Sequence, residues 1–403
     1  MTQDSETRMR ELLSSVDIPA SRMSATDLVR EGARTRRRRR QWQTAGIAGV
    51  VTLGLGAAIG VAAAPGRSSG PVPPLSQRAG ASATAVPAAC VVYRLALPAG
   101  ATAGEVNAGS PNGRYLAGVA TGKDNLGKPV RWGGARAQSI PITGIGEAVG
   151  VNNSGVVVGR GQTADRRHYA WAYVDGEVVE LPVPHGYTGA EASAINAKGE
   201  VAGVLFAGER NAAVVWQAPA ATAKVRVLAA PGGAMAFGIS DAGVVVGGLD
   251  DGSAAYRWDA HGQGGKLANP AGTAGGSALG VHGDWAYGLL TPDGKPSTGD
   301  STASTPQTVD LGSAVVWDLR TGHATKVDGG RVQAVDVSGQ LVVDHPDNTA
   351  SIREVDGALR ALPGLAAEGT AHATALSDDG TRAAGSSAGV PTSWVCAAGK
   401  GNR

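Results

Sequence analysis

Short runs of small and apolar residues, separated by polar turns, recur along the chain from about residue 90 to its end. Residues 147–159 contain two such runs, which flank a turn that ends at Gly155. Residues 168–182 contain two more, on either side of an Asp175-Gly176 turn. Apolar runs of this length between turn residues are typical of β-strands. The pattern therefore predicts a repeat unit of four short antiparallel strands.

The units can be aligned on a glycine expected in the turn after the first strand. Successive turn glycines are separated by 42, 44, 44, 40, 56 and 41 residues. A period in the forties with four strands in each unit predicts an all-β fold, a seven-bladed β-propeller of four-stranded antiparallel blades. Units five and six depart from the pattern, which leaves six or eight blades as alternatives. The seven turn glycines are Gly113, Gly155, Gly199, Gly243, Gly283, Gly339 and Gly380.

Two further columns recur, and we interpret both as structural. A second glycine follows in six units, whereas the sixth unit has Val342-Val343 there. A tryptophan recurs on the third strand, with Ile352 expected at the equivalent place in unit six, and recurrence at one structural position favours a role in the core between blades. The second glycines are Gly118, Gly159, Gly203, Gly247, Gly288 and Gly385, and the tryptophans are Trp132, Trp171, Trp216, Trp258, Trp317 and Trp394.

The two cysteines lie at the ends of the repeat region. Cys90 begins a run that matches the fourth strand of a unit yet precedes unit one, and the last unit stops after its third strand, at Cys396. We therefore expect the N-terminal strand to complete the last blade and to form a disulfide between Cys90 and Cys396.

The N-terminal part has a different composition. Residues 44–64 contain no charged residue. A helix of this length is long enough to cross a bilayer core of about 30 Å. A block of arginines at residues 34–40 precedes them, so the positive-inside rule predicts a bacterial plasma-membrane protein with its N-terminus in the cytoplasm and its C-terminal domain outside. The predicted segments are a basic, partly helical cytoplasmic tail at 1–40, a single membrane span at 44–64, a Pro/Ser/Ala-rich linker at 65–88, and the extracytoplasmic propeller at 89–399.

Two alternatives concern this N-terminal part. Ala62-Ala-Ala64 has the small residues of a signal-peptidase site, but about 40 residues precede the apolar run and Pro65 follows the site, which favours an uncleaved anchor. The tail is either a docking segment for a cytoplasmic partner or a solvated leader. The formal net charge is only +2, and the arginine block at 34–40 is local to the tail. The chain as a whole is therefore not basic, and we expect no nucleic-acid partner.

The repeats resemble a known family. The pattern Ala-x-x-Ile-Asn-x-x-Gly-x-Val-x-Gly, present at residues 192–203, resembles bacterial extracellular HAF-type repeats and, more distantly, kelch-like propellers. The basic front end is similar to that of actinobacterial membrane proteins, some of which are partners of extracytoplasmic-function sigma factors. The resemblance implies an extracellular propeller but no particular activity.

The sequence predicts no catalytic residues, metal site or cofactor. We expect neither a nucleophile elbow nor a phosphate-binding loop, and the seven histidines are scattered without paired spacing. Two side chains are candidates for ligand binding. We place Asp336 in a column of the first strand that is otherwise small, and we expect His282 of the adjacent unit nearby. The small residues of that column are Ala108, Gly150, Ala194, Gly238, Gly280 and Ala375.

Two classes of function are compatible with these features. The first is a membrane-anchored binding, sensing or protein-interaction module that recognises an extracellular protein or glycan through its loops, including the polar insertion at 291–310. The second is an extracytoplasmic hydrolase or lyase with its site at one mouth of the central channel. A cluster of Asp, His and Arg in one place would favour the enzyme.

Overall fold

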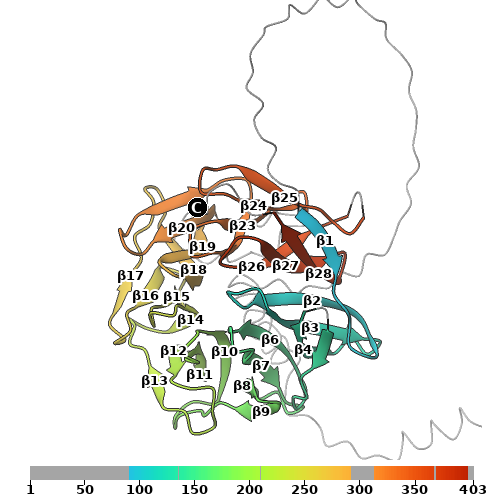
Figure 1. The fold of residues 1–403 in the computed structure, drawn as a ribbon. Helices are drawn as coiled ribbons and strands as arrows, with labels where there is room; N and C mark the ends of the chain where they lie inside the picture. Colours follow the sequence, from blue (N-terminus) through green and yellow to red (C-terminus); the bar gives the residue numbers. More distant parts are fainter. Residues whose placement is uncertain (1–89, 135, 209, 292–312, 367–368, 398–403) are drawn as a thin grey trace, which may run out of the picture. The chain divides into compact units, whose positions relative to one another are not determined.

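The computed structural model describes residues 90–397 except 135, 209, 292–312 and 367–368. The described residues form 28 strands arranged in seven four-stranded antiparallel sheets. Figure 1 shows these sheets as the blades of a ring, with the first strand of each blade nearest the axis. The expected seven-bladed propeller is confirmed.

Blades 1 to 4 each follow the chain from the innermost to the outermost strand. Blade 1 is β2 (Ala101–Gly109), β3 (Tyr115–Gly122), β4 (Gly127–Gly133) and β5 (Arg136–Ser139). Blade 2 is β6 (Ile145–Val151), β7 (Val157–Gln162), β8 (His168–Val174) and β9 (Glu177–Glu180). Blade 3 is β10 (Gly189–Ile195), β11 (Val201–Ala207), β12 (Arg210–Trp216) and β13 (Val225–Val227). Blade 4 is β14 (Ala234–Ile239), β15 (Val245–Leu249), β16 (Ala255–Trp258) and β17 (Gly264–Lys266).

Blades 5 and 6 continue in the same order, and blade 7 closes the ring. Blade 5 is β18 (Gly275–His282), β19 (Trp285–Thr291), β20 (Ser313–Asp318) and β21 (Ala324–Val327). Blade 6 is β22 (Arg331–Val335), β23 (Leu341–Asp344), β24 (Ala350–Arg353) and β25 (Leu359–Leu362). Blade 7 is β26 (His372–Leu376), β27 (Arg382–Ser387), β28 (Val390–Cys396) and, as its outermost strand, β1 (Cys90–Arg94).

The N-terminal strand therefore completes the last blade, as the cysteine positions predicted. In the β1–β28 register Cys90 lies directly opposite Cys396. The two form a disulfide across a sequence separation of 306 residues. This bond joins the first and last described strands, which are not consecutive in the chain. It therefore closes the ring covalently.

Every innermost strand carries a β-bulge, which explains the second glycine column. The register between the first and second strands shifts by one residue in all seven blades. A Cβ on Gly247 would lie 1.8 Å from the carbonyl oxygen of Met235, and one on Gly203 would lie 2.1 Å from that of Glu191. In these blades only glycine fits the close approach of the two backbones. Blade 6 has Val343 at this position.

The turn glycines confirm the alignment of the units. All seven have positive φ, between 54° and 90°. L side chains rarely adopt this region of φ, so glycine is required where each first strand turns into the second. The aligned turns therefore show which residues of the seven blades occupy equivalent positions.

The tryptophans fill the interfaces between blades, as predicted. All six are under 2% exposed. Five of them donate their indole N–H to a backbone oxygen in the outer part of the preceding blade, as Trp216 does to Pro182 at 2.8 Å. The other four such donors are Trp132, Trp258, Trp317 and Trp394.

Two assignments in the tryptophan column are wrong. Trp216 pairs with Val201, two residues before the bulge-facing glycine, whereas Trp171 pairs with the glycine itself. Tyr173 therefore occupies the equivalent place in blade 2, and the displaced Trp171 Nε1 has no hydrogen-bond partner. In blade 6 the register gives that place to Arg353, because Ile352 points to the opposite face and packs between blades 6 and 7.

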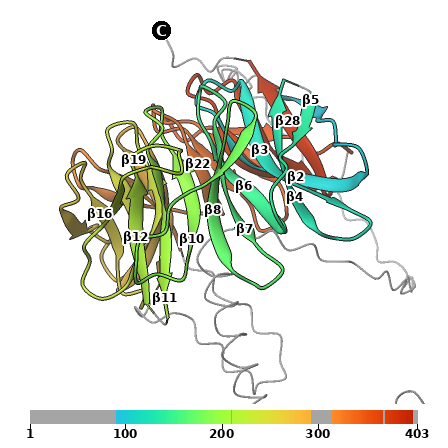
Figure 2. The same ribbon diagram turned by 90° about the horizontal axis from the view of Figure 1, so that it is seen from below.

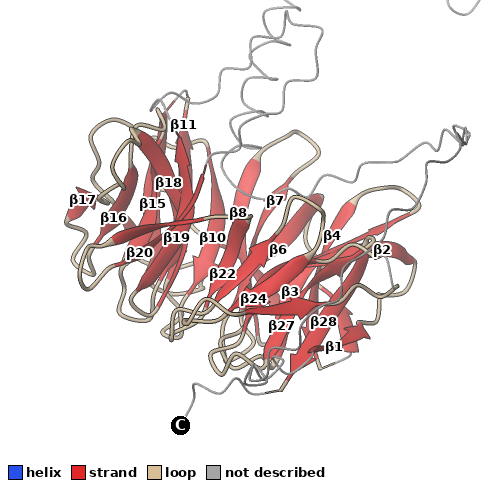
Figure 3. Cartoon of the chain, turned by 90° about the horizontal axis from the view of Figure 1, so that it is seen from above, coloured by secondary structure: helices blue, strands red, loops and turns tan. Residues whose placement is uncertain are grey.

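The strands run between two opposite faces of the ring, which Figures 2 and 3 show from the side. We call the end with the first-to-second strand turns the turn face. We call the other end the loop face, where the second-to-third strand hairpins lie and where the chain passes from one blade to the next. The insertion connects β19 to β20 and so leaves the ring at the loop face, although its residues 292–312 lie outside the described part.

The predicted tail, membrane span and linker, residues 1–88, also lie outside the described residues. Within the part that is described, there is no helix with the length and apolar character needed to cross a membrane.

Candidate functional site

The loop-face half of the innermost strands carries the strongest gathering of charged groups near the axis. In six units the residue eight positions before the turn glycine lies just before the bulge. Six of the seven residues at this register are partly exposed and Glu191 is buried. From blade 1 to blade 7 they are Glu105, Glu147, Glu191, Met235, Ser277, Arg331 and His372. We define the axial arc as the five charged or ionisable members of this set together with their partners Arg160, His168 and Asp344.

On blades 2 and 3 the axial arc is a chain of ion pairs. Arg160 contacts Glu147 at 2.5 Å and lies 3.7 Å from Oε2 of Glu191. His168 Nδ1 lies 2.6 Å from Glu191 Oε1, and its Nε2 lies 2.9 Å from Gln162. Burial would lower the pKa of Arg160, but the two carboxylates hold it above the usual value. This part of the arc joins two blades through one guanidinium group that two carboxylates share.

On blades 6 and 7 the axial arc contains a histidine–carboxylate pair. His372 Nδ1 contacts Asp344 of the neighbouring blade, and Asp344 also accepts hydrogen bonds from Gln333 and from the backbone of Ala373. Burial alone would lower the pKa of His372, but the hydrogen bond and charge of Asp344 raise it. Burial lowers the pKa of Arg331, which Asp344 partly opposes. The histidine is therefore held toward its cationic form.

Glu105 lies between these two groups and differs from both. Its pKa is raised by burial and by the charge of Glu147, and lowered by the charge of His372. In the described part of the chain its carboxyl group makes no hydrogen bond or ion pair, whereas Glu147 also accepts a hydrogen bond from Asn107 at 3.1 Å. Glu105 is therefore the carboxyl group of the arc that remains available to a ligand.

Blades 4 and 5 present apolar groups at the same height. Met235 occupies the register of the glutamates, and the bulge residues are Phe237 and Leu279. All three side chains are partly exposed. We call these three residues the apolar sector. A polar arc over blades 6, 7, 1, 2 and 3 therefore faces an apolar sector over the remaining two blades.

Asp336, a predicted site residue, has a place other than the one expected. In the register Ala334 is the equivalent of the small residues Gly150 and Ala194, because it pairs with Val342 just after the bulge. Asp336 instead begins the turn, where blades 2 and 3 have Asn152 and Asn196. The assignment of Asp336 to the small-residue column is wrong because the bulge and the turn were not separated.

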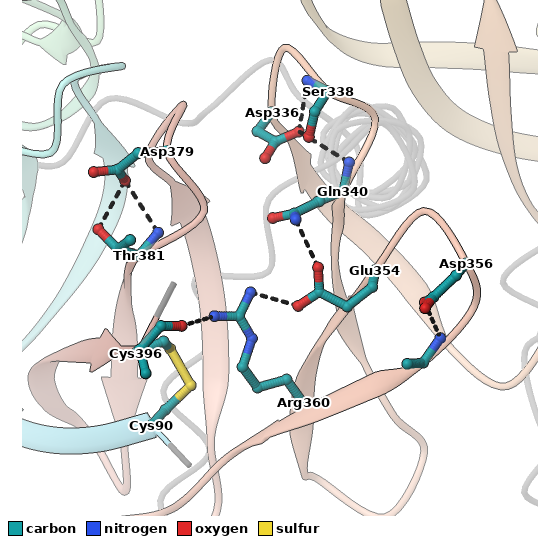
Figure 4. A network of polar contacts seen from close by, with 12 residues as sticks. Cys90, Asp336, Ser338, Gln340, Glu354, Asp356, Arg360, Asp379, Thr381 and Cys396 are labelled. Carbon is teal, nitrogen blue, oxygen red and sulfur yellow. Dashed lines mark hydrogen bonds and ion pairs between the residues drawn. A yellow bond between two sulfur atoms is a disulfide. The ribbon is translucent and has the colours of Figure 1, made fainter. Parts of the chain in front are cut away.

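Asp336 is committed to that turn. It is 1% exposed, and its Oδ1 accepts hydrogen bonds from the backbone N–H of Ser338 and Gln340, both at 2.9 Å. Its buried Oδ2 has no hydrogen-bond partner, and burial raises its pKa. Figure 4 shows how the network continues from Gln340 through Glu354 to Arg360, which donates to Ala397 beside the disulfide.

His282 lies on the same turn face, where a Cβ on the next residue, Gly283, would lie 3.6 Å from the Cα of Val337, the residue after Asp336. The charge of Asp336 is among the causes that raise the pKa of His282. Its Nε2 lies 2.5 Å from Asp378 of blade 7. Burial would lower the pKa of His282, but the hydrogen bond and charge of Asp378 raise it. The structure thus brings the two predicted residues near each other, and ligand binding by them stays a prediction. The strands that the insertion connects, β19 and β20, are joined at the other face.

The Gly-x-Ser-x-Gly spacing occurs twice, contrary to the expectation from sequence: at residues 66–70, which lie outside the described residues, and at residues 385–389. Ser387 is 1% exposed at the hairpin between β27 and β28. Its hydroxyl donates to Thr370 and accepts from the backbone of Leu365. A buried serine with these partners is a structural residue and not a nucleophile on a strand-to-helix turn.

An open pocket of about 500 Å³ lies on the loop face between blades 2 and 3, along residues 180–189 and Arg167. It adjoins the arc, because Gly189 lies against the backbone of His168. No group of three or more potential metal ligands occurs among the described residues.

Sequence reasoning missed the axial arc, although one signal was present. A glutamate recurs eight residues before the turn glycine in three successive units, as Glu105, Glu147 and Glu191. Their partners come from neighbouring strands and blades, and no sequence spacing records those contacts.

No protein-family model matches the chain, and no curated protein matches it significantly. Among solved structures, the virginiamycin B lyase of Staphylococcus aureus is 10% identical with a TM-score of 0.48, covering 76% of this chain and 99% of that one. YCF48 bound to a D1 peptide is 9% identical with a TM-score of 0.46, covering 79% and 100%. A chain of a mitotic checkpoint complex is 13% identical with a TM-score of 0.49, covering 79% and 96%. Likenesses this distant carry no functional argument, and the fold assignment rests on the seven sheets themselves.

Proposed function

We propose that this protein is a membrane-anchored, extracytoplasmic binding or sensing module of the HAF-repeat type, whose ligand is held at the axial arc. One observation carries the proposal. The innermost strands share one backbone plan, yet their axial side chains on the loop face are not the same around the ring: blades 1 to 3 carry glutamate there and blades 4 to 7 carry Met235, Ser277, Arg331 and His372. Side chains that build a repeat recur with it, whereas a site for one asymmetric ligand must break the repeat.

The anchor supports an extracytoplasmic location. The uncharged residues 44–64 follow the arginine block, and the linker at 65–88 separates them from the ring. A disulfide between the first and last strands fits an oxidising compartment. In this proposal the ring recognises a protein or glycan outside the cell, and the tail lies in the cytoplasm, where it has room for a regulatory partner.

Photocrosslinking on intact cells tests the binding site. A benzoylphenylalanine at Ser277, on the axial side of blade 5, should give a defined crosslink. The same residue at exposed Val227, on the outer strand of blade 3, is the matched control and should not. Equal labelling at both positions, or none at Ser277, contradicts the proposal.

Protease added to intact cells tests the topology separately. It should degrade the ring and spare the tail at 1–40. Soluble protein that begins at Pro65 would show cleavage instead of anchoring and would refute the membrane part of the proposal alone.

A second candidate function, an extracytoplasmic hydrolase or lyase, is favoured by Glu105. A partly buried, unpaired carboxyl group with a raised pKa, near the charge of His372, has the properties of a general acid or base. Replacement of Glu105 by Gln separates the two functions once a ligand is known. An enzyme would lose turnover and keep its ligand, whereas a binding module would show no turnover in either form.

A further inference from the structure

The charges of the axial arc do not balance. The arc contains four carboxyl groups, of Glu105, Glu147, Glu191 and Asp344, and two guanidinium groups, of Arg160 and Arg331. Two negative charges are left over when the histidines are neutral, and one when His372 is cationic. Arg160 is shared by Glu147 and Glu191, which leaves one negative charge on blades 2 and 3. Arg331 balances Asp344, so Glu105 carries the other negative charge.

One carboxyl group of the arc lacks a partner, and a second has one unpaired oxygen. The carboxyl group of Glu105 makes no hydrogen bond or ion pair within the described residues. Glu191 is 6% exposed, yet its Oε2 has no hydrogen-bond partner, and the nearest guanidinium nitrogen is 3.7 Å away. A buried carboxylate oxygen without a donor is costly, and a cation nearby offsets part of that cost. The unpaired Glu105 is the group such a cation can reach.

The apolar sector completes the chemistry of the site. Met235, Phe237 and Leu279 leave apolar surface exposed beside the polar arc. Sites for small organic groups combine apolar surface with polar groups that fix the orientation, and here the apolar sector supplies the first and the arc the second. An aromatic wall also attracts cations.

We propose that the axial arc binds a cationic group, an amine or a guanidinium, whose apolar body rests against the apolar sector. This inference rests on the proposed function and specifies its ligand. Glu105 contacts the cation directly, and Glu147 and Glu191 add attraction through the ion-pair chain of blades 2 and 3. A basic side chain of a protein ligand and an amino sugar both carry such a group.

Three matched probes test the sign of the charge. The probes are 4-fluorobenzylamine, 4-fluorobenzyl alcohol and 4-fluorobenzoate, which share one aromatic body, and fluorine NMR of the full-length protein in detergent measures their dissociation constants. We expect the amine to bind at least tenfold more tightly than the alcohol and the benzoate not to bind. Added salt should weaken the amine and leave the alcohol unchanged, a result that needs no variant.

Two variants locate the site. Glu105→Gln removes one charge with little change in shape and should weaken the amine about tenfold. Glu177→Gln removes an exposed charge on β9, at the outer edge of blade 2, and is the control that should bind as the unaltered protein does. Thermal unfolding of both variants checks that the ring is intact.

Several results overturn the inference. Benzoate binding as tight as amine binding would do so, and so would an unchanged dissociation constant in Glu105→Gln. If no probe binds while the Ser277 crosslink persists, the inference of a cationic ligand is wrong and the proposed binding site is retained. If the crosslink is also missing, the proposed function fails with it.

Discussion

The two faces of the ring are made by the same strands but differ in how strictly their side chains repeat. On the turn face, Asn196 caps its own turn and donates from Nδ2 to Ser240 of the next blade at 3.0 Å, and Asn152 does the same toward Asn196. On the loop face, no two neighbouring blades share an axial pair. Glu147 stands beside Arg160 in blade 2, whereas Met235 stands beside Gly248 in blade 4.

The difference teaches which residues build the ring and which remain for a ligand. The turn-face residues satisfy each other's backbone groups from blade to blade, so they are needed wherever a blade occurs. The axial residues of the loop face satisfy no recurring backbone group. These residues can therefore vary to suit a ligand without loss of the ring.

Removing the disulfide should have the largest effect, and it should weaken both faces alike. In the chain-entropy model, closing a loop of 306 residues stabilises the fold by up to about 5 kcal/mol. Chemical unfolding of a double variant, Cys90→Ser with Cys396→Ser, measures the loss. Hydrogen exchange should show blade 7 opening first, and a loss confined to one face would contradict ring closure by this bond.

Replacing an asparagine of the turn face by alanine should lower the free energy of unfolding more than replacing one of the loop face. Asn196→Ala removes a buried cap and two donated hydrogen bonds and should lower the free energy of unfolding by about 3 kcal/mol. Asn107→Ala removes partly exposed contacts to Glu147 and Ala148 and should cost about 1 kcal/mol. Urea titration compares the two, and equal losses would break the division between the faces.

Asp336→Asn should stabilise the protein. Asparagine keeps the acceptor for the turn and replaces the unpartnered Oδ2 by a donor, as Asn196 has toward the next blade. We expect a gain of about 1 kcal/mol at neutral pH. The pKa of Asp336 is raised by burial, so its contribution is favourable below the ordinary carboxyl pKa and is lost as pH rises through the folded value. The gain should therefore shrink in acid, and a destabilised Asp336→Asn would refute this account.

The smallest effect is expected at His282. The pKa of His282 is raised in the folded protein, so its pairing with Asp378 stabilises the fold below the ordinary histidine pKa. That stability is lost as pH rises through the raised value. Stability curves of His282→Gln and the unaltered protein should differ at pH 5 and converge by pH 8. A difference that grows with pH would show the pairing to be assigned wrongly.

Features that repeat could be predicted from the sequence. The turn glycines and the tryptophans recur at regular spacing, so spacing alone predicted the blades. The N-terminal run matches the fourth strand of a unit, and this match predicted the Cys90–Cys396 pair. The errors arose within a unit. Asp336 lies two residues from Ala334 and Ile352 one residue from Arg353, the residues that hold those positions in the register, because a bulge changes which residues of a strand share a face and leaves its composition unchanged.

The sequence by itself therefore determined the order of strands and the closure of the ring, and it favoured the seven blades that the structure has. The tertiary structure alone decided the axial arc and the two faces. Glu191 meets His168 and Arg160 of another blade, and His372 meets Asp344 of another, across distances of 23 to 31 residues in sequence. Backbone patterns repeat because every blade makes the same hydrogen bonds, whereas these charges meet only when the ring brings unlike positions of neighbouring blades together.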